Sequence, residues 1–302
     1  MARIEHRSIK VGAVDVFYRE TIPLKAATGQ PSILLLHGFP SSSHQFQRLM
    51  EALGNEFRMV APDYPGFGQT QVSPDEETGF DYSFETLAKV MEGFVDALDL
   101  GSFILYAFDF GGPVGFRIAM RRPELIAGVI IQNANSYDAG LSDGARHFAM
   151  IDSGDAEGVR ALEQLVSLDG IKFQYLTGVS DPASILPDGY ILDHHYLEPA
   201  ERQAAMIALL LDYKANLASY STWQDWLRRH LPPTQILWGR NDPLFLEAGA
   251  RAYLADLPQA ELHLFDTGHF ALEECLDEIA PVIAEFVRRI SQSRRMSAVD
   301  RV

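Results

Sequence analysis

Short apolar segments that predict strands alternate with amphipathic segments that predict helices over residues 1–134. Residues 11–19 are apolar at every second position from Val14 to Tyr18, the pattern of a half-buried strand. Continuous apolar segments predict buried strands at residues 32–36, 56–61, 102–107 and 125–132. Apolar residues three or four positions apart predict a helix at 83–98, and another is predicted from Gly111 to about Met120. This alternation predicts an α/β fold with a mostly parallel sheet and helices on both faces.

The alternation stops at residues 135–230, which show helical patterns and turns but no buried strand. Beyond them the sequence predicts a strand at 234–238, a helix at 244–257, a strand at 261–265 and a helix at 276–290. We therefore predict a core formed by residues 1–134 and 231–302. Residues 135–230 are predicted to be inserted as a helical cap over the carboxyl ends of the strands, where ligands bind. From Ser291 onward the sequence is polar and aperiodic, which predicts a frayed end.

The segment that follows the strand at 102–107 carries the first candidate for chemistry. Small residues, Ala107 and Gly111, lie two positions before and after Asp109, and a predicted helix follows at once. Small residues allow a sharp strand-to-helix turn, which would present the Asp109 carboxylate above the sheet and near a helix N-terminus that favours an anion. Taken alone, Asp109 is better explained as a helix N-cap than as a nucleophile.

The strand at 32–36 is followed by a loop suited to stabilising negative charge. The loop reads His37-Gly38-Phe39-Pro40, and Gly38 lets the chain turn so that the Phe39 N–H faces the site. Together with the Phe110 N–H, it would form an oxyanion hole. A tight turn at Asp63–Gly68 follows the next strand and is uninformative by itself.

Two further strand ends carry the remaining groups of a catalytic set. Asp242 follows the strand at 234–238, and His269 follows the strand at 261–265. Taken singly, Asp242 fits a turn and His269 fits a structural histidine as well as they fit catalysis. Their appearance after successive strands, with Asp109 earlier in the chain, predicts a nucleophile, an acid and a base in that order.

These motifs resemble those of an α/β-hydrolase of the epoxide hydrolase and haloalkane dehalogenase group. The resemblance covers about residues 10–134 and 231–290, and it rests on His37–Pro40, Asp63–Gly68, Asp109–Gly112, Asp242 and His269. It implies the α/β-hydrolase fold and a reaction that needs no cofactor. In that reaction Asp109 attacks a saturated carbon to form an ester, and His269, oriented by Asp242, activates the water that hydrolyses it.

The residues around Asp109 bear on the leaving group. A departing halide needs N–H donors, whereas an epoxide oxygen needs a proton, typically from a phenol. Phe110 and Phe39 occupy positions that carry Trp and often Asn in haloalkane dehalogenases, and Phe110 and Pro113 replace the two Arg of fluoroacetate dehalogenases. We therefore predict an epoxide hydrolase, with haloalkane or haloacid dehalogenation as the alternative. Phe108, where this group usually has His, makes the site more apolar and predicts a hydrophobic small-molecule substrate.

Epoxide opening requires tyrosines above Asp109. Tyr213 precedes Asp242 at a spacing that resembles that of a ring-opening tyrosine in the cap of epoxide hydrolases. The same region supplies a halide-contacting tyrosine in some dehalogenases, and a buried structural tyrosine is a further alternative. We select Tyr175 as the second phenol, ahead of Tyr190, Tyr196 and Tyr220.

Composition and charge narrow the possible partners. The chain has 302 residues, of which 47% are hydrophobic, and 25 Lys and Arg stand against 41 Asp and Glu, giving a net charge of −16. The apolar content suffices for a sizeable core, and the acidic balance argues against nucleic acid and anionic membranes as partners. No apolar run is long enough to span a bilayer, and the single Cys permits no internal disulfide, so a cytoplasmic protein is expected.

No metal or cofactor is predicted. His194 and His195 are adjacent and point apart on a helix, so they do not form a metal site. No Gly-rich phosphate loop follows the first strand. The sequence does not fix the oligomeric state and is compatible with a homodimer. A binding protein that keeps the fold without turnover is the remaining alternative.

Overall fold

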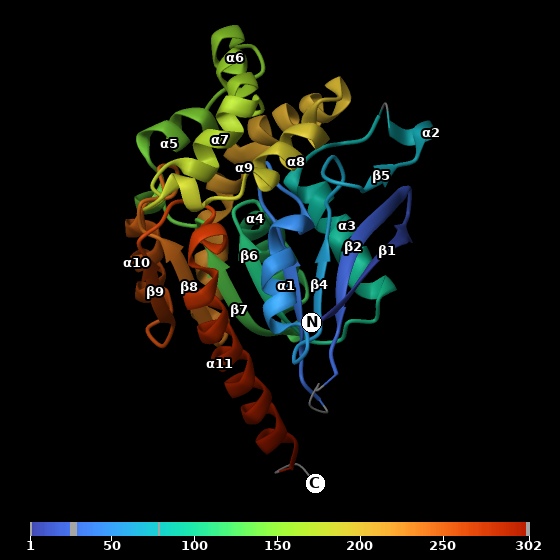
Figure 1. Cartoon of the computed structure of the whole chain (residues 1–302), viewed down its shortest axis with the longest axis vertical. Helices are drawn as coiled ribbons and strands as arrows, with labels where there is room; N and C mark the ends of the chain where they lie inside the picture. Colours follow the sequence, from blue (N-terminus) through green and yellow to red (C-terminus); the bar gives the residue numbers. More distant parts are fainter. Residues whose placement is uncertain (1, 25–28, 78, 300–302) are drawn as a thin grey trace.

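A nine-stranded sheet runs through the residues that the computed structural model describes, which are 2–24, 29–77 and 79–299 (Figure 1). The strands are β1 (Arg3–Val11), β2 (Val14–Ile22), β3 (Ser32–Leu36), β4 (Met59–Pro62), β5 (Gln71–Val72), β6 (Phe103–Phe108), β7 (Ile126–Gln132), β8 (Thr234–Gly239) and β9 (Glu261–Phe265). Their order is β1-β2-β4-β3-β6-β7-β8-β9, with β5 paired to β2. Strand β2 is antiparallel to its neighbours, and every pair from β4 to β9 is parallel. The predicted, mostly parallel sheet is confirmed.

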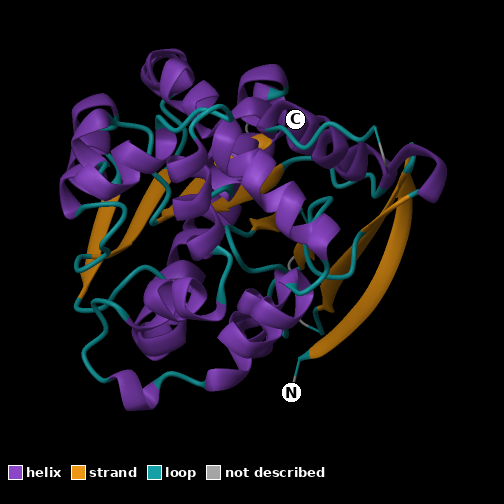
Figure 2. Cartoon of the chain, turned by 90° about the horizontal axis from the view of Figure 1, so that it is seen from above, coloured by secondary structure: helices purple, strands orange, loops and turns teal. Residues whose placement is uncertain are grey.

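Helices cover both faces of this sheet. On one face α1 (Gln47–Leu53) contacts α11 (Ala271–Val299), and on the other α3 (Phe84–Ala97) contacts α4 (Gly111–Arg121) (Figures 1 and 2). Helix α10 (Glu247–Asp256) contacts β8, and the short helix α2 (Pro74–Glu77) follows β5 in the chain. Helix α3 begins where its sequence predicts, because the Ser83 hydroxyl accepts a hydrogen bond from the Thr86 N–H.

Five helices occupy the segment between β7 and β8 and lie over the carboxyl ends of the strands (Figure 1). We call them the cap helices: α5 (Asp143–Ala149), α6 (Ala156–Leu165), α7 (Leu168–Leu176), α8 (Pro187–Leu197) and α9 (Ala200–His230). All of residues 135–230 are described, and their extended structure is limited to an isolated bridge from Leu141 to Phe245. The segment thus places a helical layer above the sheet edge at which Asp109 lies.

The N-terminal strand was not anticipated, and the strand predicted at 11–19 is half of a hairpin. The chain turns after Val11, so β1 pairs with β2 along its whole length. Every residue of β1 is at least partly exposed, and four of its residues are Arg3, Glu5, Arg7 and Lys10. A charged edge strand of this kind buries too little apolar surface to show the usual periodicity.

The prediction of a frayed end from Ser291 is wrong, because α11 continues to Val299. Ser291 is buried, and its hydroxyl donates a hydrogen bond to the Val287 carbonyl within the helix. The side chain of Arg295 donates to the Ser291 carbonyl, so polar side chains bond back onto the helix. Near its other end, α11 bends at Cys275, whose backbone angles are not helical.

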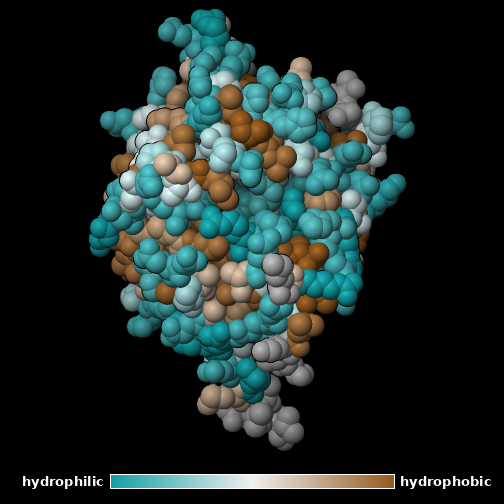
Figure 3. Space-filling view, viewed as in Figure 1, coloured by the Kyte–Doolittle hydropathy of each residue, from teal (hydrophilic) through white to brown (hydrophobic). Residues whose placement is uncertain are grey.

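The outer surface is mostly hydrophilic on the face seen in Figure 3, where apolar residues form separate patches. This agrees with the excess of acidic residues in the chain. None of the helices in the described ranges combines the length and apolar character needed to cross a membrane.

Candidate active site

Asp109 lies at a sharp turn between β6 and α4. Its φ of +49° is in the left-handed region, which costs a residue with a side chain about 1 kcal/mol or more. A Cβ on Gly111 would lie 2.2 Å from the Leu36 carbonyl oxygen, and one on Gly38 would lie 2.3 Å from the Cβ of Asp109. Glycine at both positions therefore allows β3, its loop and the Asp109 turn to come together.

The Asp109 carboxylate is buried and held by backbone amides. Phe39 N–H donates to Oδ1 at 2.7 Å, and the Phe110 amide also bonds to the carboxylate. Burial raises the pKa of Asp109 to about 6, although the nearby His269 and the two amides oppose the shift. The first residues of α4 have no side-chain cap, so the N-cap alternative for Asp109 does not describe this turn.

His269 lies between the two carboxylates. Its Nδ1 is 2.6 Å from Oδ2 of Asp242, and its Nε2 is 3.8 Å from Oδ2 of Asp109. Nε2 is buried and makes no hydrogen bond within the described part of the chain. Burial opposes the charged imidazole, but Asp242, and to a smaller extent Asp109, outweigh it and raise the pKa of His269. The structure thus brings together the three residues predicted as nucleophile, acid and base.

Asn133, which sequence reasoning missed, holds Asp242 in place. Its Nδ2 donates to Oδ2 of Asp242 at 2.8 Å, and its Oδ1 accepts from the Gly239 N–H at 2.9 Å. Oδ1 of Asp242 accepts from the amides of Leu244 and Phe245 at 2.8 and 3.0 Å. Phe245 forms an extended bridge with Leu141, so α10 starts at Glu247 rather than at residue 244. A polar residue directly after the predicted strand at 125–132 was the available signal for Asn133.

The loop that carries Phe39 is fastened to the turn at Asp63–Gly68. His37 is fully buried, and burial lowers its pKa to about 3, so the ring is neutral. Its Nε2 accepts from the Tyr64 N–H at 3.2 Å, which leaves Nδ1 to donate to the Gly38 carbonyl at 3.1 Å. The turn therefore has a structural role in placing the Phe39 amide.

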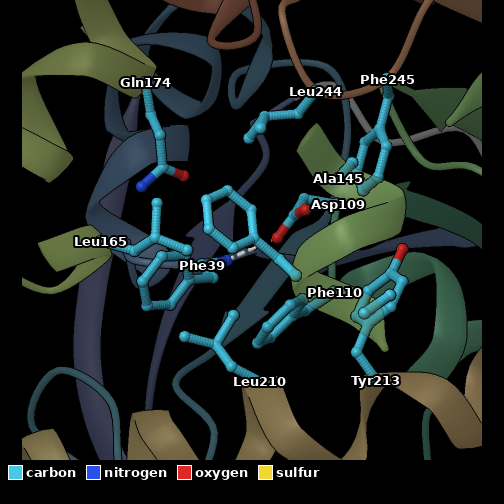
Figure 4. A pocket seen from close by; sticks show the side chains of 12 residues that line it. Phe39, Asp109, Phe110, Ala145, Leu165, Gln174, Leu210, Tyr213, Leu244 and Phe245 are labelled. Carbon is cyan, nitrogen blue, oxygen red and sulfur yellow. Dashed lines mark hydrogen bonds between the residues drawn. The ribbon is translucent and has the colours of Figure 1, made fainter. Parts of the chain in front are cut away.

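A cavity of about 60 Å³ lies directly above Asp109, between the sheet and the cap helices (Figure 4). The cavity is therefore small. The residues that line it are Phe39, Asp109, Phe110, Ala145, Phe148, Ala149, Leu165, Gln174, Leu210, Tyr213, Leu244 and Phe245. Apart from Asp109, Gln174 and Tyr213, this lining is apolar.

Tyr213, on α9, lines the cavity as the sequence predicts (Figure 4). Its hydroxyl is hydrogen bonded to that of Tyr220, about two turns further along the same helix. Tyr220 in turn accepts a hydrogen bond from Nδ2 of Asn135 at 3.2 Å. Burial raises the pKa of Tyr213 well above 10, with Tyr220 and Asp109 adding to the shift.

Tyr175 lies outside the cavity lining, contrary to the sequence prediction. Its hydroxyl donates to Oδ2 of Asp193 at 2.6 Å, and its ring stacks on Phe270 with the centroids 3.9 Å apart. The neighbouring residue, Gln174, points into the cavity instead (Figure 4). Sequence reasoning missed Gln174, because adjacent positions on a helix differ by about 100° in direction and the rotation of α7 was unknown.

No group of three or more His, Cys, Asp or Glu side chains within the described residues is arranged to hold a metal ion. His194 is half-buried and His195 exposed on α8, and Nδ1 of His195 lies 3.0 Å from Glu198. The side chains that the site itself offers for chemistry are a buried carboxylate, an imidazole and a phenol.

Comparisons with known proteins agree with this architecture. Residues 31–275 match the family model described as alpha/beta hydrolase fold. The chain is 36% identical over 288 residues to an uncharacterized hydrolase of Saccharomyces cerevisiae, a match that covers 94% of this chain and 96% of that protein. It is 28% identical over 271 residues to haloalkane dehalogenase 2 of Mycobacterium tuberculosis, which covers 84% and 87% of the two chains.

The fold is also shared with a solved structure. Haloalkane dehalogenase DbeA from Bradyrhizobium elkani has a TM-score of 0.76 to this chain at 22% identity, over 96% of this chain and 100% of that one. The sequence relatives named above are hydrolases, and they do not single out one leaving group. The predicted fold is confirmed, and the chain belongs to the alpha/beta hydrolase fold family.

Proposed function

We propose that this protein hydrolyses small, apolar epoxides to vicinal diols through a covalent ester on Asp109. One observation carries the proposal. Asp109 faces an apolar cavity in which Tyr213 supplies the one hydroxyl among the lining residues. An epoxide oxygen must gain a proton as its bond to carbon breaks, and a phenol can supply one.

In the first step Oδ2 of Asp109 attacks an epoxide carbon. Oδ1 is engaged by the Phe39 amide, so Oδ2 is the oxygen left for attack. The carbon–oxygen bond of the ring breaks, and the released oxygen takes the proton of Tyr213. An alkoxide is a stronger base than an ordinary phenolate, so a phenol can supply this proton. The Tyr220 hydroxyl can then donate to the phenolate.

In the second step water hydrolyses the ester. Nε2 of His269 takes a proton from water, and Asp242 stabilises the imidazolium. The hydroxide attacks Cγ of Asp109, where the amides of Phe39 and Phe110 stabilise the developing oxyanion. The ester bond breaks, His269 returns its proton to the departing alkoxide, and the new carboxylic acid at Asp109 loses its proton, which restores Tyr213. One water oxygen remains in Asp109.

The position of the cap helices supports a hydrophobic small molecule as substrate. Residues from α5, α6, α7 and α9 form the roof of the cavity, so we propose that residues 135–230 act as a cap that encloses the substrate. The net charge of −16 and the apolar lining both disfavour an anionic substrate.

Dehalogenation of small haloalkanes is a second candidate, supported by the 28% identity to haloalkane dehalogenase 2. The same Asp109, His269 and Asp242 would serve it. A halide leaves without a proton, so Tyr213 would act there only as a hydrogen-bond donor.

The two candidates are separated by the mass of the trapped ester. In His269→Gln, a terminal epoxide should add its whole mass to Asp109, because nothing leaves, whereas a bromoalkane should add only its alkyl group. Wild-type protein should release diol from the epoxide, and Asp109→Asn should form neither adduct. In labelled water, the first turnover should place the label in Asp109 and not in the diol. Label that appears directly in first-turnover diol would rule out the ester route.

A further inference from the structure

Gln174 places an amide inside the otherwise apolar cavity. The residue lies on α7 in the cap, and its side chain points toward the middle of the cavity that Asp109 and Tyr213 also line (Figure 4). It is only 2% exposed, although a glutamine side chain carries two N–H donors and a carbonyl acceptor. Burying such a group is unfavourable unless it is hydrogen bonded.

The protein itself leaves this amide poorly satisfied. Among the described residues, its side chain makes one hydrogen bond, from Nε2 to the Gly170 carbonyl one turn earlier in α7, at a length of 3.5 Å. That length is beyond the usual range for N–H···O bonds, so the interaction is weak. By contrast, the neighbouring Tyr175 is bound to Asp193 at 2.6 Å. A buried amide with one long bond, facing a ligand cavity, is a group available to a ligand.

The cavity is small enough to say which atom the amide would meet. With a volume of about 60 Å³, it admits a substrate of few heavy atoms. The lining residues other than Asp109, Gln174 and Tyr213 are apolar, so the polar leaving atom of a small substrate has these two cap side chains as its donors. Gln174 and Tyr213 come from different helices, α7 and α9, and they lie on different sides of Asp109 (Figure 4).

We propose that Gln174 donates a hydrogen bond from Nε2 to the leaving atom of the substrate, as the partner of Tyr213 in the cap. The inference rests on the proposed attack by Asp109 and extends it to the recognition of the leaving group. The two donors differ in kind. Tyr213 gives up its proton to an oxygen, whereas an amide only hydrogen bonds and stays intact, so it stabilises a departing halide as well as a departing oxygen.

This division gives the site a second, separable activity. Ester formation from small bromoalkanes should depend on Gln174 and little on the acidity of Tyr213, whereas ester formation from epoxides should depend on both. In both reactions a carbon–oxygen bond to Asp109 forms. The carbon–bromine bond or the ring carbon–oxygen bond breaks in exchange, bromide leaves as an ion, and only the ring oxygen takes a proton.

The test measures the rate of ester formation by intact-protein mass in the His269→Gln background, with a short terminal epoxide and a short bromoalkane as probes. Gln174→Met removes the amide and keeps the size and unbranched shape. Tyr213→Phe removes the acidic proton. Phe173→Leu, on the same helix but 44% exposed and outside the cavity lining, is the matched control. Gln174→His restores an N–H donor.

We expect Gln174→Met to slow the reaction of both probes by about 10- to 100-fold, the effect of losing one hydrogen bond to a developing charge. Tyr213→Phe should abolish the reaction of the epoxide and spare that of the bromoalkane by comparison, and Gln174→His should recover part of both. If Gln174→Met matches the Phe173→Leu control with both probes, Gln174 only packs and the inference is overturned, while the proposed function stands. If no adduct forms on the parent protein with any probe, the proposed function itself is overturned.

Discussion

Asp109 combines a strained backbone with a carboxyl group whose pKa burial raises to about 6. Glycines at 38 and 111 make the turn possible, and the Phe39 amide holds one carboxylate oxygen. The Asp109 carboxylate remains ionised at neutral pH, yet its raised pKa makes it a stronger base than an ordinary aspartate. The rate of attack should therefore change with pH around this pKa.

The rate of ester formation should fall by about tenfold per pH unit below about pH 6, because only the ionised carboxylate attacks. Because the pKa of Asp109 is raised, its ionised carboxylate is present above about pH 6 and is lost as the pH falls through that value. Rapid quenching of wild-type protein with an epoxide, followed by intact mass, measures this rate. Circular dichroism at each pH checks that the protein stays folded. A rate that stays flat down to pH 5 would contradict the raised pKa.

Asn133→Gly should slow hydrolysis of the ester more than its formation. Asn133 has a φ of +41° and donates to Asp242, which orients His269. Glycine tolerates that φ and removes only the side chain, so the expected loss is about 10- to 100-fold in the hydrolytic step, with the ester accumulating during turnover. Asp99→Gly is the matched control, because Asp99 is exposed and has a φ of +46°. Equal slowing of both steps would instead indicate a general loss of structure.

At this scale the sequence predicts residues that follow strands better than residues on helices. Asp109 and Asp242 follow the buried strands β6 and β8, and His269 follows the half-buried strand β9. Parallel strands bring their carboxyl ends to one edge of the sheet. Tyr175 and Gln174 are neighbours on α7, whose polar and apolar residues are spread around its surface. The sequence therefore gives no face of α7 to point at the cavity, and only the packed structure distinguishes the two.

Among the secondary structure elements, helices α7 and α8 are joined through the buried carboxylate of Asp193 to the segment that follows the Phe39 loop. Asp193 on α8 is fully buried and accepts hydrogen bonds from Tyr175 on α7 and from Nε2 of His44, at 2.6 and 2.5 Å. His44 lies in the short helical turn after the loop that carries Phe39. Burial favours the neutral ring, but Asp193 outweighs it and raises the pKa of His44 above its usual 6.5. The cluster thus holds α7 and α8 against the helical turn that follows Phe39.

Asp193→Asn should lower the free energy of unfolding by about 3 kcal/mol, because it leaves buried partners without a charged acceptor. Calorimetry should show a lower Tm than that of Glu198→Gln, which disrupts only an exposed pair with His195. The contribution of a raised histidine pKa is fully present below pH 6.5 and is lost as the pH rises through the pKa of His44. The difference in Tm between wild type and Asp193→Asn should therefore shrink at alkaline pH, and a difference that grows would contradict this account.

Elements with a buried face are predictable, and those held by long-range polar contacts are not. Strands β3 and β6 are buried on both faces and appear in the sequence as continuous apolar runs. By contrast β1 is charged and exposed, and the end of α11 is polar. Asp193 bonds to His44, which lies 149 residues away in the sequence, so no local sequence pattern could predict this contact.

For the molecule as a whole, the size of the cavity should decide which substrates are accepted. In a series of terminal epoxides of increasing chain length, kcat/KM of the wild type should peak at a short chain, because the cavity measures only about 60 Å³. Leu165→Ala removes bulk from the lining and should move the optimum toward longer chains. Leu186→Ala, at an exposed cap position, should leave the optimum unchanged. An optimum that stays fixed in Leu165→Ala would mean that substrates bind elsewhere or only after a large movement of the cap.

The bend in α11 places the chain's one thiol where it is nearly inert. Cys275 is 8% exposed, and burial together with nearby carboxylates raises its pKa to about 11, so the nucleophilic thiolate is scarce in neutral buffer. Epoxides and bromoalkanes ordinarily modify cysteines first. In this protein the Cys275 thiolate is too scarce to compete, so excess electrophile should label the folded chain once, at the Asp109 carboxylate. Any labelling of Cys275 should begin only when the chain unfolds.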